Sequence, residues 1–228
     1  MKSQPAQPDL AESLAPGREA GGNSRAPWFA WPLCLLCVAL ALASLILGFL
    51  NGRTLDEILV KEVIATIAVL AVAFSVVGAL IVSCRPKNPI GWIFCAAALC
   101  QGLVIFGEEY ATYALITRPG SLPLGAEASW LKEWIWAPGL GLVLVFLPLL
   151  FPDGRPPTRR WRWVIPFGSL SIGLISVLGA ILFWPHRGPA LMEYGGEAED
   201  VVAPVWALIT DFVAFPMMLV AGLGAVIS

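Results

Sequence analysis

An acidic residue inside an apolar segment is the first place in this sequence where side-chain chemistry would be expected. Asp211 lies well inside such a run, and Pro216 follows it and frees the carbonyl of Phe212 from its helical hydrogen bond. A carboxylate within a bilayer costs about 2.5–3.5 kcal/mol on insertion scales, so Asp211 should face other helices. A proton-sensitive or ligand-sensitive hinge is one interpretation. A hydrogen-bonded Asp211 that fixes helix packing is the interpretation we favour.

A second polar group lies near the end of another apolar run. Glu108, Glu109, Tyr110 and Tyr113 follow one another closely there, and on a helix Glu109 and Tyr113 share a face. Glu108, Glu109 and Tyr113 could therefore form an outer rim for a cation or a polar ligand, although acids at a helix end are more often simply solvated. Gln101 lies deeper in the same run and is expected to bond to a neighbouring helix.

Metal and nucleophilic chemistry find little support in the sequence. Cys34 and Cys37 form a CxxC, but no second pair completes a four-ligand zinc site, so both are expected to be small packing residues. His186 is the single histidine and cannot build a metal site alone. No dinucleotide-binding glycine motif, phosphate-binding loop or HExxH zinc motif occurs. We expect no catalytic site, no cofactor and no enzymatic activity.

The elements that carry these residues are predicted from hydropathy. The chain is 58% hydrophobic and 13% charged, whereas soluble domains carry about 25% charged residues. Segments of about 20 apolar residues span a bilayer as helices. The sequence therefore predicts an all-α integral membrane bundle of about six transmembrane helices. The predicted spans are 29–50, 64–84, 90–115, 134–151, 164–184 and 204–227.

Charge placement predicts the orientation of these spans. The densest basic cluster lies between the fourth and fifth spans, and short loops rich in Lys and Arg face the cytoplasm. This cluster consists of Arg155, Arg159, Arg160 and Arg162. It should contact anionic lipid headgroups, at about 1 kcal/mol per residue. The N-terminus is then cytoplasmic, with residues 1–27 as a disordered tail and 28–228 as the transmembrane domain.

Local signals mark several boundaries of the predicted helices. Asn88-Pro89 predicts an N-cap followed by proline at the first helical position, and Pro152-Asp153-Gly154 predicts a tight turn. A capping box is predicted over residues 54–57. Small residues four apart predict close helix packing at three places. These pairs are Ser44 and Gly48, Ala98 and Gly102, and Ser169 and Gly173. Kinks are predicted at Pro138, Pro148, Pro166 and Pro216.

Three motifs occur in an order that resembles a known family. They are RPKNPIGWI at 85–93, EEYATYAL at 108–115 and FPDGRPPTRRWR at 151–162. The chain over about residues 29–228 is similar to the N-terminal membrane region of bacterial sensor histidine kinases of the type common in actinobacteria. The resemblance implies a signal-input module without the phosphoacceptor helix and the ATP-binding domain. The chain would be either a fragment of such a kinase or a stand-alone relative.

Two functional hypotheses follow from these observations. The leading one is a non-catalytic, membrane-embedded sensory module of a two-component system, in which a stimulus shifts the packing of kinked helices. The alternative is a small membrane transporter or channel component, which would need polar groups along a path, whereas only Asp211 and Gln101 lie deep. Expected partners are membrane lipids, a second copy of the chain or a cytoplasmic kinase, and no nucleic acid. The expected location is the plasma membrane.

Overall fold

Helices make up the regular structure of the described chain. The computed structural model describes residues 26–54, 63–151, 154 and 164–184, and no strand occurs among them. Five helical units in this part are long and apolar enough to cross a membrane. They are α2 (Ala26–Leu50), α4 (Val63–Cys84), α5 (Pro89–Thr112) with η1 (Tyr113–Thr117), α6 (Gly125–Gly141) with η2 (Leu142–Phe146) and α7 (Leu147–Leu150), and α8 (Val164–Leu182).

The predicted all-α membrane bundle is confirmed over these residues. Five spans match the predicted ones, while the sixth predicted span at 204–227, with Asp211 and Pro216, lies outside the described residues. The N-terminal tail to residue 25 and the cluster Arg155, Arg159, Arg160 and Arg162 also lie outside them. The orientation of the bundle stays a prediction.

The start of the fourth span is a correction to the sequence analysis. We expected the span at 134–151, but helix α6 begins at Gly125, so Lys132 and Glu133 lie within the helix. Lys132 is 8% exposed and forms an ion pair with Glu108 of α5. Pairing with Glu108 offsets part of the cost that a lone buried charge would impose on this helix.

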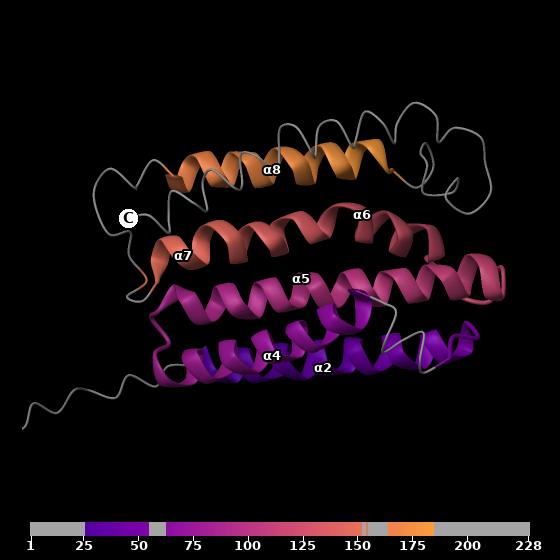
Figure 1. The fold of residues 1–228 in the computed structure, drawn as a ribbon, viewed down its shortest axis with the longest axis horizontal. Coiled ribbons are helices and arrows are strands. Elements are labelled where there is room, and N and C mark those ends of the chain that lie inside the picture. The colour runs from indigo at the N-terminus through magenta and orange to yellow at the C-terminus, as the bar shows by residue number, and fades with distance from the viewer. Residues whose placement is uncertain (1–25, 55–62, 152–153, 155–163, 185–228) are drawn as a thin grey trace, which may run out of the picture.

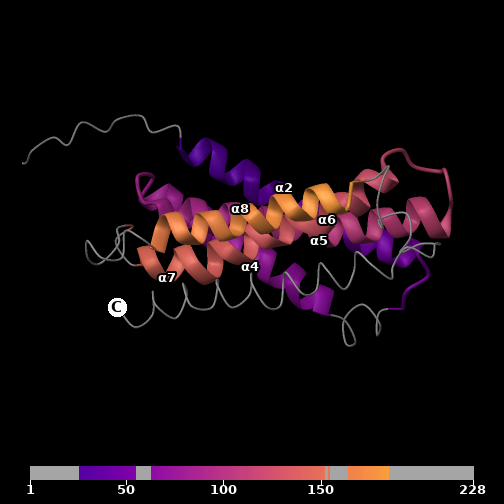
Figure 2. The same cartoon turned by 90° about the horizontal axis from the view of Figure 1, so that it is seen from above.

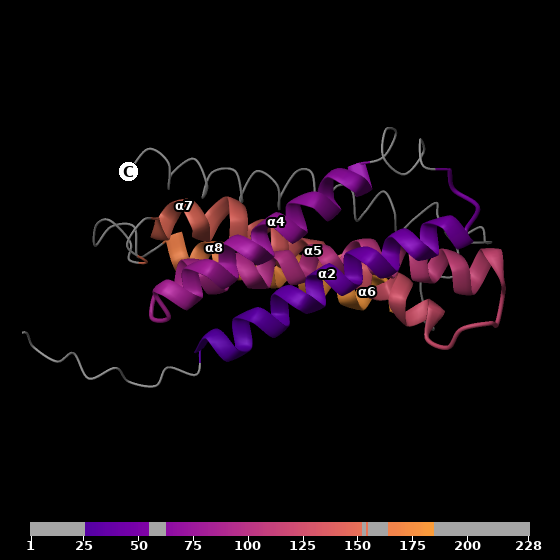
Figure 3. The ribbon, with the colours of Figure 1, turned by 90° about the horizontal axis from the view of Figure 1, so that it is seen from below.

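Helix α5 lies at the centre of the bundle (Figure 1). It packs against α2 and α4 on one side and against α6 on the other, and α8 packs on α6. Figure 2 and Figure 3 show the same arrangement from above and below. In Figure 3, α2 and α4 run obliquely across α5. The bundle is therefore layered, and α5 is the element that packs against both sides.

Glycines allow the helices to approach closely. A Cβ at Gly78 of α4 would lie 2.7 Å from the Cys95 Sγ of α5, and one at Gly91 would lie 2.8 Å from Val82. Ser44, Gly48, Ala98 and Gly102 are all buried, as expected for packing positions. Ser169 and Gly173 of α8 are exposed instead, and a Cβ at Gly173 would meet no atom within 4 Å.

Apolar side chains on the outside of the bundle fit a lipid environment. Along α8, Leu170 is 67% exposed and Ile181 is 65% exposed. Soluble monomers rarely expose large contiguous apolar patches, whereas lipid-facing helices do so routinely. Other exposed apolar residues on α2 include Trp28, Phe29, Leu35, Ile46 and Phe49.

Tryptophans near the helix ends use their indole N–H groups. Trp31 donates to Ser83 Oγ at 3.2 Å and Trp92 donates to the carbonyl of Pro86 at 3.4 Å. At the other end of the bundle, Trp130 of α6 donates to the carbonyl of Ala180 of α8 at 2.8 Å. Each ring thus packs on apolar surface while its polar edge is satisfied. The Trp31 and Trp130 bonds join neighbouring spans, one at each end of the bundle.

Candidate functional site: a buried ion-pair network at one end of the bundle

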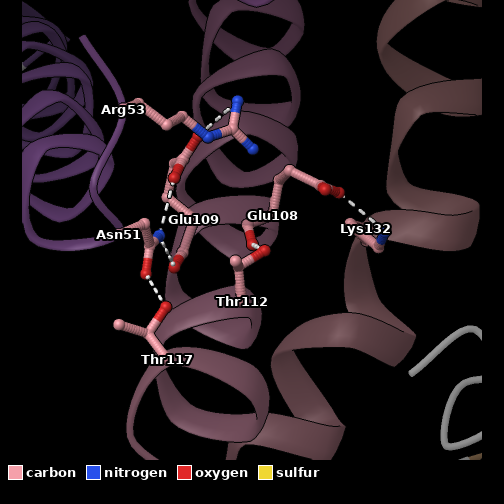
Figure 4. Close-up of polar contacts among 7 residues, drawn as sticks. All are labelled: Asn51, Arg53, Glu108, Glu109, Thr112, Thr117 and Lys132. Atoms are coloured by element: carbon pink, nitrogen blue, oxygen red, sulfur yellow. Dashed lines mark hydrogen bonds and ion pairs between the residues drawn. The ribbon is translucent and has the colours of Figure 1, made fainter. Parts of the chain in front are cut away.

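Charged and polar side chains from three helical units meet at one end of the bundle. We call this end the polar end, and it contains Asn51, Arg53, Glu108, Glu109, Thr112, Thr117, Lys132 and Glu133. Figure 4 shows most of these side chains converging on α5 from α2 and α6. The opposite end, where α5 begins and α7 ends, is called the Gly154 end.

The C-terminal turn of α2 positions Asn51 and Arg53. The Arg53 N–H donates to the carbonyl of Gly48 at 3.1 Å and the Gly52 N–H donates to that of Phe49 at 3.0 Å. These two bonds form a Schellman motif, with Gly52 at the left-handed position at φ 81°. A glycine takes this conformation without the steric cost that a side chain adds. The motif reverses the chain and presents Asn51 and Arg53 to α5.

Glu109 is the centre of the contact between α2 and α5. The residue is 3% exposed, and its carboxylate Oε1 lies 3.3 Å from the Arg53 guanidinium. The Asn51 amide donates to Glu109 Oε2 at 2.8 Å and to the Glu109 carbonyl at 3.1 Å (Figure 4). Thr117 Oγ1 donates in turn to Asn51 Oδ1 at 2.7 Å. We call this set the Glu109 clamp.

Glu108, one residue earlier, holds a different helix. Its carboxylate Oε2 lies 2.6 Å from Lys132 Nζ of α6, and Lys132 also lies 3.3 Å from Glu133 Oε1 (Figure 4). Successive residues on an α-helix point about 100° apart, so two adjacent glutamates can reach helices on different sides. Gly107 permits the approach, because a Cβ there would lie 3.0 Å from the Ala128 carbonyl. We call the Glu108–Lys132 pair the Glu108 clamp.

The burial of these charges determines how much stability the chain loses when one partner of a clamp is removed. Lys132 is 8% exposed, whereas the Glu108 side chain is 29% exposed. Exposed ion pairs contribute about 0–1 kcal/mol, but removing one partner of a buried pair costs about 3–5 kcal/mol. The Glu109 clamp, with its carboxylate almost fully covered, belongs to the second class. The Glu108 clamp lies between the two classes.

The predicted rim residues are brought together only in part. The expectation that the two acids are solvated is wrong for Glu109, which is buried and paired. Tyr113 is half-buried at the start of η1, and its side chain joins neither clamp among the described residues. Tyr110 instead anchors the following loop, because its hydroxyl donates to the carbonyl of Pro123 at 2.6 Å.

Six residues of the polar end were missed by the sequence analysis: Asn51, Arg53, Thr112, Thr117, Lys132 and Glu133. The signal for the first two was present, since Asn-Gly directly after an apolar run is a helix C-terminus with glycine at the left-handed position. Lys132 lay outside the predicted fourth span at 134–151. Its partner is 24 residues away in the chain, so no local pattern could identify the pair.

Deeper polar residues behave as packing groups. Gln101 is half-buried beside Gly139 of α6, where a Cβ would lie 3.3 Å from its Nε2, and no hydrogen bond of its side chain occurs within the described residues. Cys34 and Cys37 are buried, as a packing role predicts, and Cys34 Sγ lies 3.5 Å from Ser75 Oγ. In the part of the chain that the structure describes, no three His, Cys, Asp or Glu side chains could hold a metal ion.

The fold and this site define the chain as an all-α, multi-pass membrane protein with a charged network buried at one end. Comparison with known proteins finds no matching family model, no matching curated protein and no matching solved structure. The argument for function therefore depends on the geometry of the site and on the motifs of the sequence.

Proposed function

We propose that this chain is a non-catalytic sensory module of the cell membrane, of the kind that supplies the input to a two-component histidine kinase. In this proposal the polar end faces outward and the Gly154 end faces the cytoplasm. The observation that carries the proposal is the pair of adjacent glutamates on α5, which hold α2 and α6 separately. The three sequence motifs that resemble the membrane region of such kinases add support.

A buried ion pair suits a sensor because a small chemical change has a large effect on it. Loss of one charge leaves the other buried and unpaired, which costs several kcal/mol. A stimulus at the polar end that favours an open clamp would therefore shift how α2 or α6 packs on α5. A ligand can drive such a shift only by binding one arrangement better than the other.

The deep polar groups of the described chain favour sensing over transport. Ser44 donates to the carbonyl of Leu40 at 2.7 Å, and Ser171 donates to that of Phe167 at 2.9 Å. These hydroxyls are thus satisfied within their own helices. A transporter needs polar groups that converge on a path through the membrane. The ionised groups of the described network instead gather at one end.

Fusion of a histidine kinase output domain after Ser228 tests the proposal, with phosphorylation of a response regulator as the measurement. Glu109→Gln keeps the shape of the side chain but removes its charge. We expect it to change output by about fivefold or more, the lower range of allosteric coupling. Glu127→Gln is the matched control, because Glu127 lies in the first turn of α6 outside both clamps. Equal output from both variants, in membranes that contain equal amounts of protein, would refute the proposal.

A further inference from the structure

The fourth span contains a widened helical turn between two prolines. This turn, η2, runs from Leu142 to Phe146, and the Leu147 N–H closes it by donating to the carbonyl of Leu142, five residues earlier. Pro138 precedes it within α6 and Pro148 follows it. Proline at 148 supplies no N–H to the turn before it, so the regular α pattern is interrupted there. Such π-turns hold one extra residue and recur at functional sites.

The π-turn is enclosed on both sides by close contacts. On the α5 side, η2 packs against α5, and three residues before the π-turn a Cβ at Gly139 of α6 would lie 2.8 Å from the Cys100 Cβ. On the α8 side, a Cβ at Gly168 would lie 2.8 Å from Val145 Cγ1 and 3.8 Å from the Val145 Cβ. Val145 belongs to the π-turn and is 0% exposed. The side chain of Val145 therefore occupies a notch that the missing side chain of Gly168 creates.

The same span joins the two ends of the bundle. At the polar end, Lys132 fixes α6 to Glu108 of α5. At the Gly154 end, the Gly154 N–H donates to the carbonyl of Leu150, and Gly154 has φ 74°. A Cβ at Gly154 would lie 2.6 Å from Pro89 Cδ, so the residue after α7 is pressed against the first turn of α5. The span is thus fixed to α5 at both of its ends.

Two fixed ends explain why the extra residue sits between them. If α6 is held at Lys132 and the turn after α7 is held at Pro89, a mismatch in helical register must be absorbed in between. Each residue of an α-helix adds about 100° of rotation and 1.5 Å of rise. The π-turn holds one extra residue, so the rotation of about 100° and the rise of about 1.5 Å that this residue would add to an α-helix are taken up within the widened turn. If either end were released, no mismatch in helical register would remain between the ends, and the turn could return to the regular α-helical form.

We propose that the π-turn η2 is the switch that couples the Glu108 clamp to the Gly154 end. When the clamp opens, α6 is free to rotate, η2 relaxes to a regular α-helix, and Val145 leaves the Gly168 notch. Helix α7 and the Gly154 contact with Pro89 move with it. This inference rests on the proposed function, since it specifies how a stimulus at the polar end would reach the opposite end.

The test uses a disulfide across the notch. In the double variant Val145→Cys/Gly168→Cys, the two Cβ positions are 3.8 Å apart, which is the mean separation in disulfides. Replacing Val145 also removes the Cγ1 atom that a side chain at 168 would meet. Copper–phenanthroline oxidises the pair in membranes. Trypsin then cuts within the arginine-rich segment 155–162, and non-reducing electrophoresis shows whether the disulfide still joins the two halves. The single variants report any bridge to a native cysteine.

The informative comparison is between this double cysteine variant and a triple variant that also carries Glu108→Gln. Lys132 keeps Glu133 as a partner on its own helix at 3.3 Å, so the change releases α6 from α5 without leaving Lys132 alone. We expect the initial rate of cross-linking to fall about fivefold or more, and Glu127→Gln to leave it unchanged. Deletion of Val143 removes the extra residue of η2. It should abolish the cross-link between positions 145 and 168, whether position 108 carries Glu or Gln.

The outcomes separate this inference from the proposed function. An unchanged cross-linking rate in Glu108→Gln overturns the switch, even if the kinase fusion responds to the same substitution. A reduced rate together with a constant kinase output supports the switch and contradicts the sensory function. Cross-linking of the Val143 deletion at the original rate would show that η2 does not set the position of Val145.

Discussion

At the polar end, buried charged groups hold α2 and α6 to α5, whereas at the Gly154 end close backbone contacts hold the chain. Glu109 and Lys132 need their partners because a buried charge without a counter-charge is costly. The contact between Gly154 and Pro89 depends only on close packing, since a side chain at Gly154 would clash with the Pro89 ring. The first kind of contact responds to solution chemistry and the second responds to movement of the backbone. In the proposed function, the polar end receives the stimulus and the Gly154 end transmits it.

The largest effect should come from removing the carboxylate of the Glu109 clamp. Glu109→Ala removes the buried carboxylate that faces the Arg53 guanidinium and accepts from the Asn51 amide. We expect the free energy of unfolding in detergent micelles to fall by about 3–5 kcal/mol. Alkylation of the buried Cys37 thiol during denaturation measures it, because Cys37 is 0% exposed in the folded chain.

Glu127→Ala is the control for this loss of stability. Glu127 is a carboxylate of the same end but belongs to neither clamp. Its substitution should change the free energy of unfolding by less than about 0.5 kcal/mol, as at ordinary surface sites. Similar losses for the two alanine variants would mean that the Glu109 clamp is no stronger than a surface contact.

The Gly154 end should respond to a methyl group instead of a charge. Gly154→Ala adds a Cβ 2.6 Å from Pro89 Cδ at a left-handed position, and overpacking of this kind costs about 1–3 kcal/mol. Gly120→Ala is matched to it, because Gly120 has φ 78° but no atom within 4 Å of an added Cβ. The Cys37 alkylation assay should show Gly154→Ala as the less stable variant by at least about 1 kcal/mol. Equal stabilities would show that contact with Pro89 does not constrain this end.

Features set by neighbouring residues could be predicted from the sequence. Asn88 caps α5 as expected, since its side chain accepts from the Ile90 N–H at 3.0 Å with Pro89 directly after it. Gly154 adopts the left-handed conformation that a turn after the fourth span implies. Hydropathy located five spans because lipid requires long apolar helices.

Features set by contacts between distant residues could not be predicted. The two clamps join positions 24 or more residues apart, so no local pattern pointed to the partners of Glu108 and Glu109. The kink predicted at Pro166 stays a prediction, because the described part of α8 begins only two residues earlier, at Val164. Between Pro138 and Pro148, the structure has a π-turn, which depends on how both ends of the span are held.

A double-mutant cycle on Glu108 and Lys132 tests most directly whether the polar end holds its helices by charge. The free energy of unfolding is measured by Cys37 alkylation for Glu108→Gln, Lys132→Gln and the double variant. Because the two side chains share a contact of 2.6 Å, we expect a coupling energy of at least about 1 kcal/mol. Additive losses, within about 0.5 kcal/mol, would show that the ion pair does not hold α6 to α5 and would contradict the account.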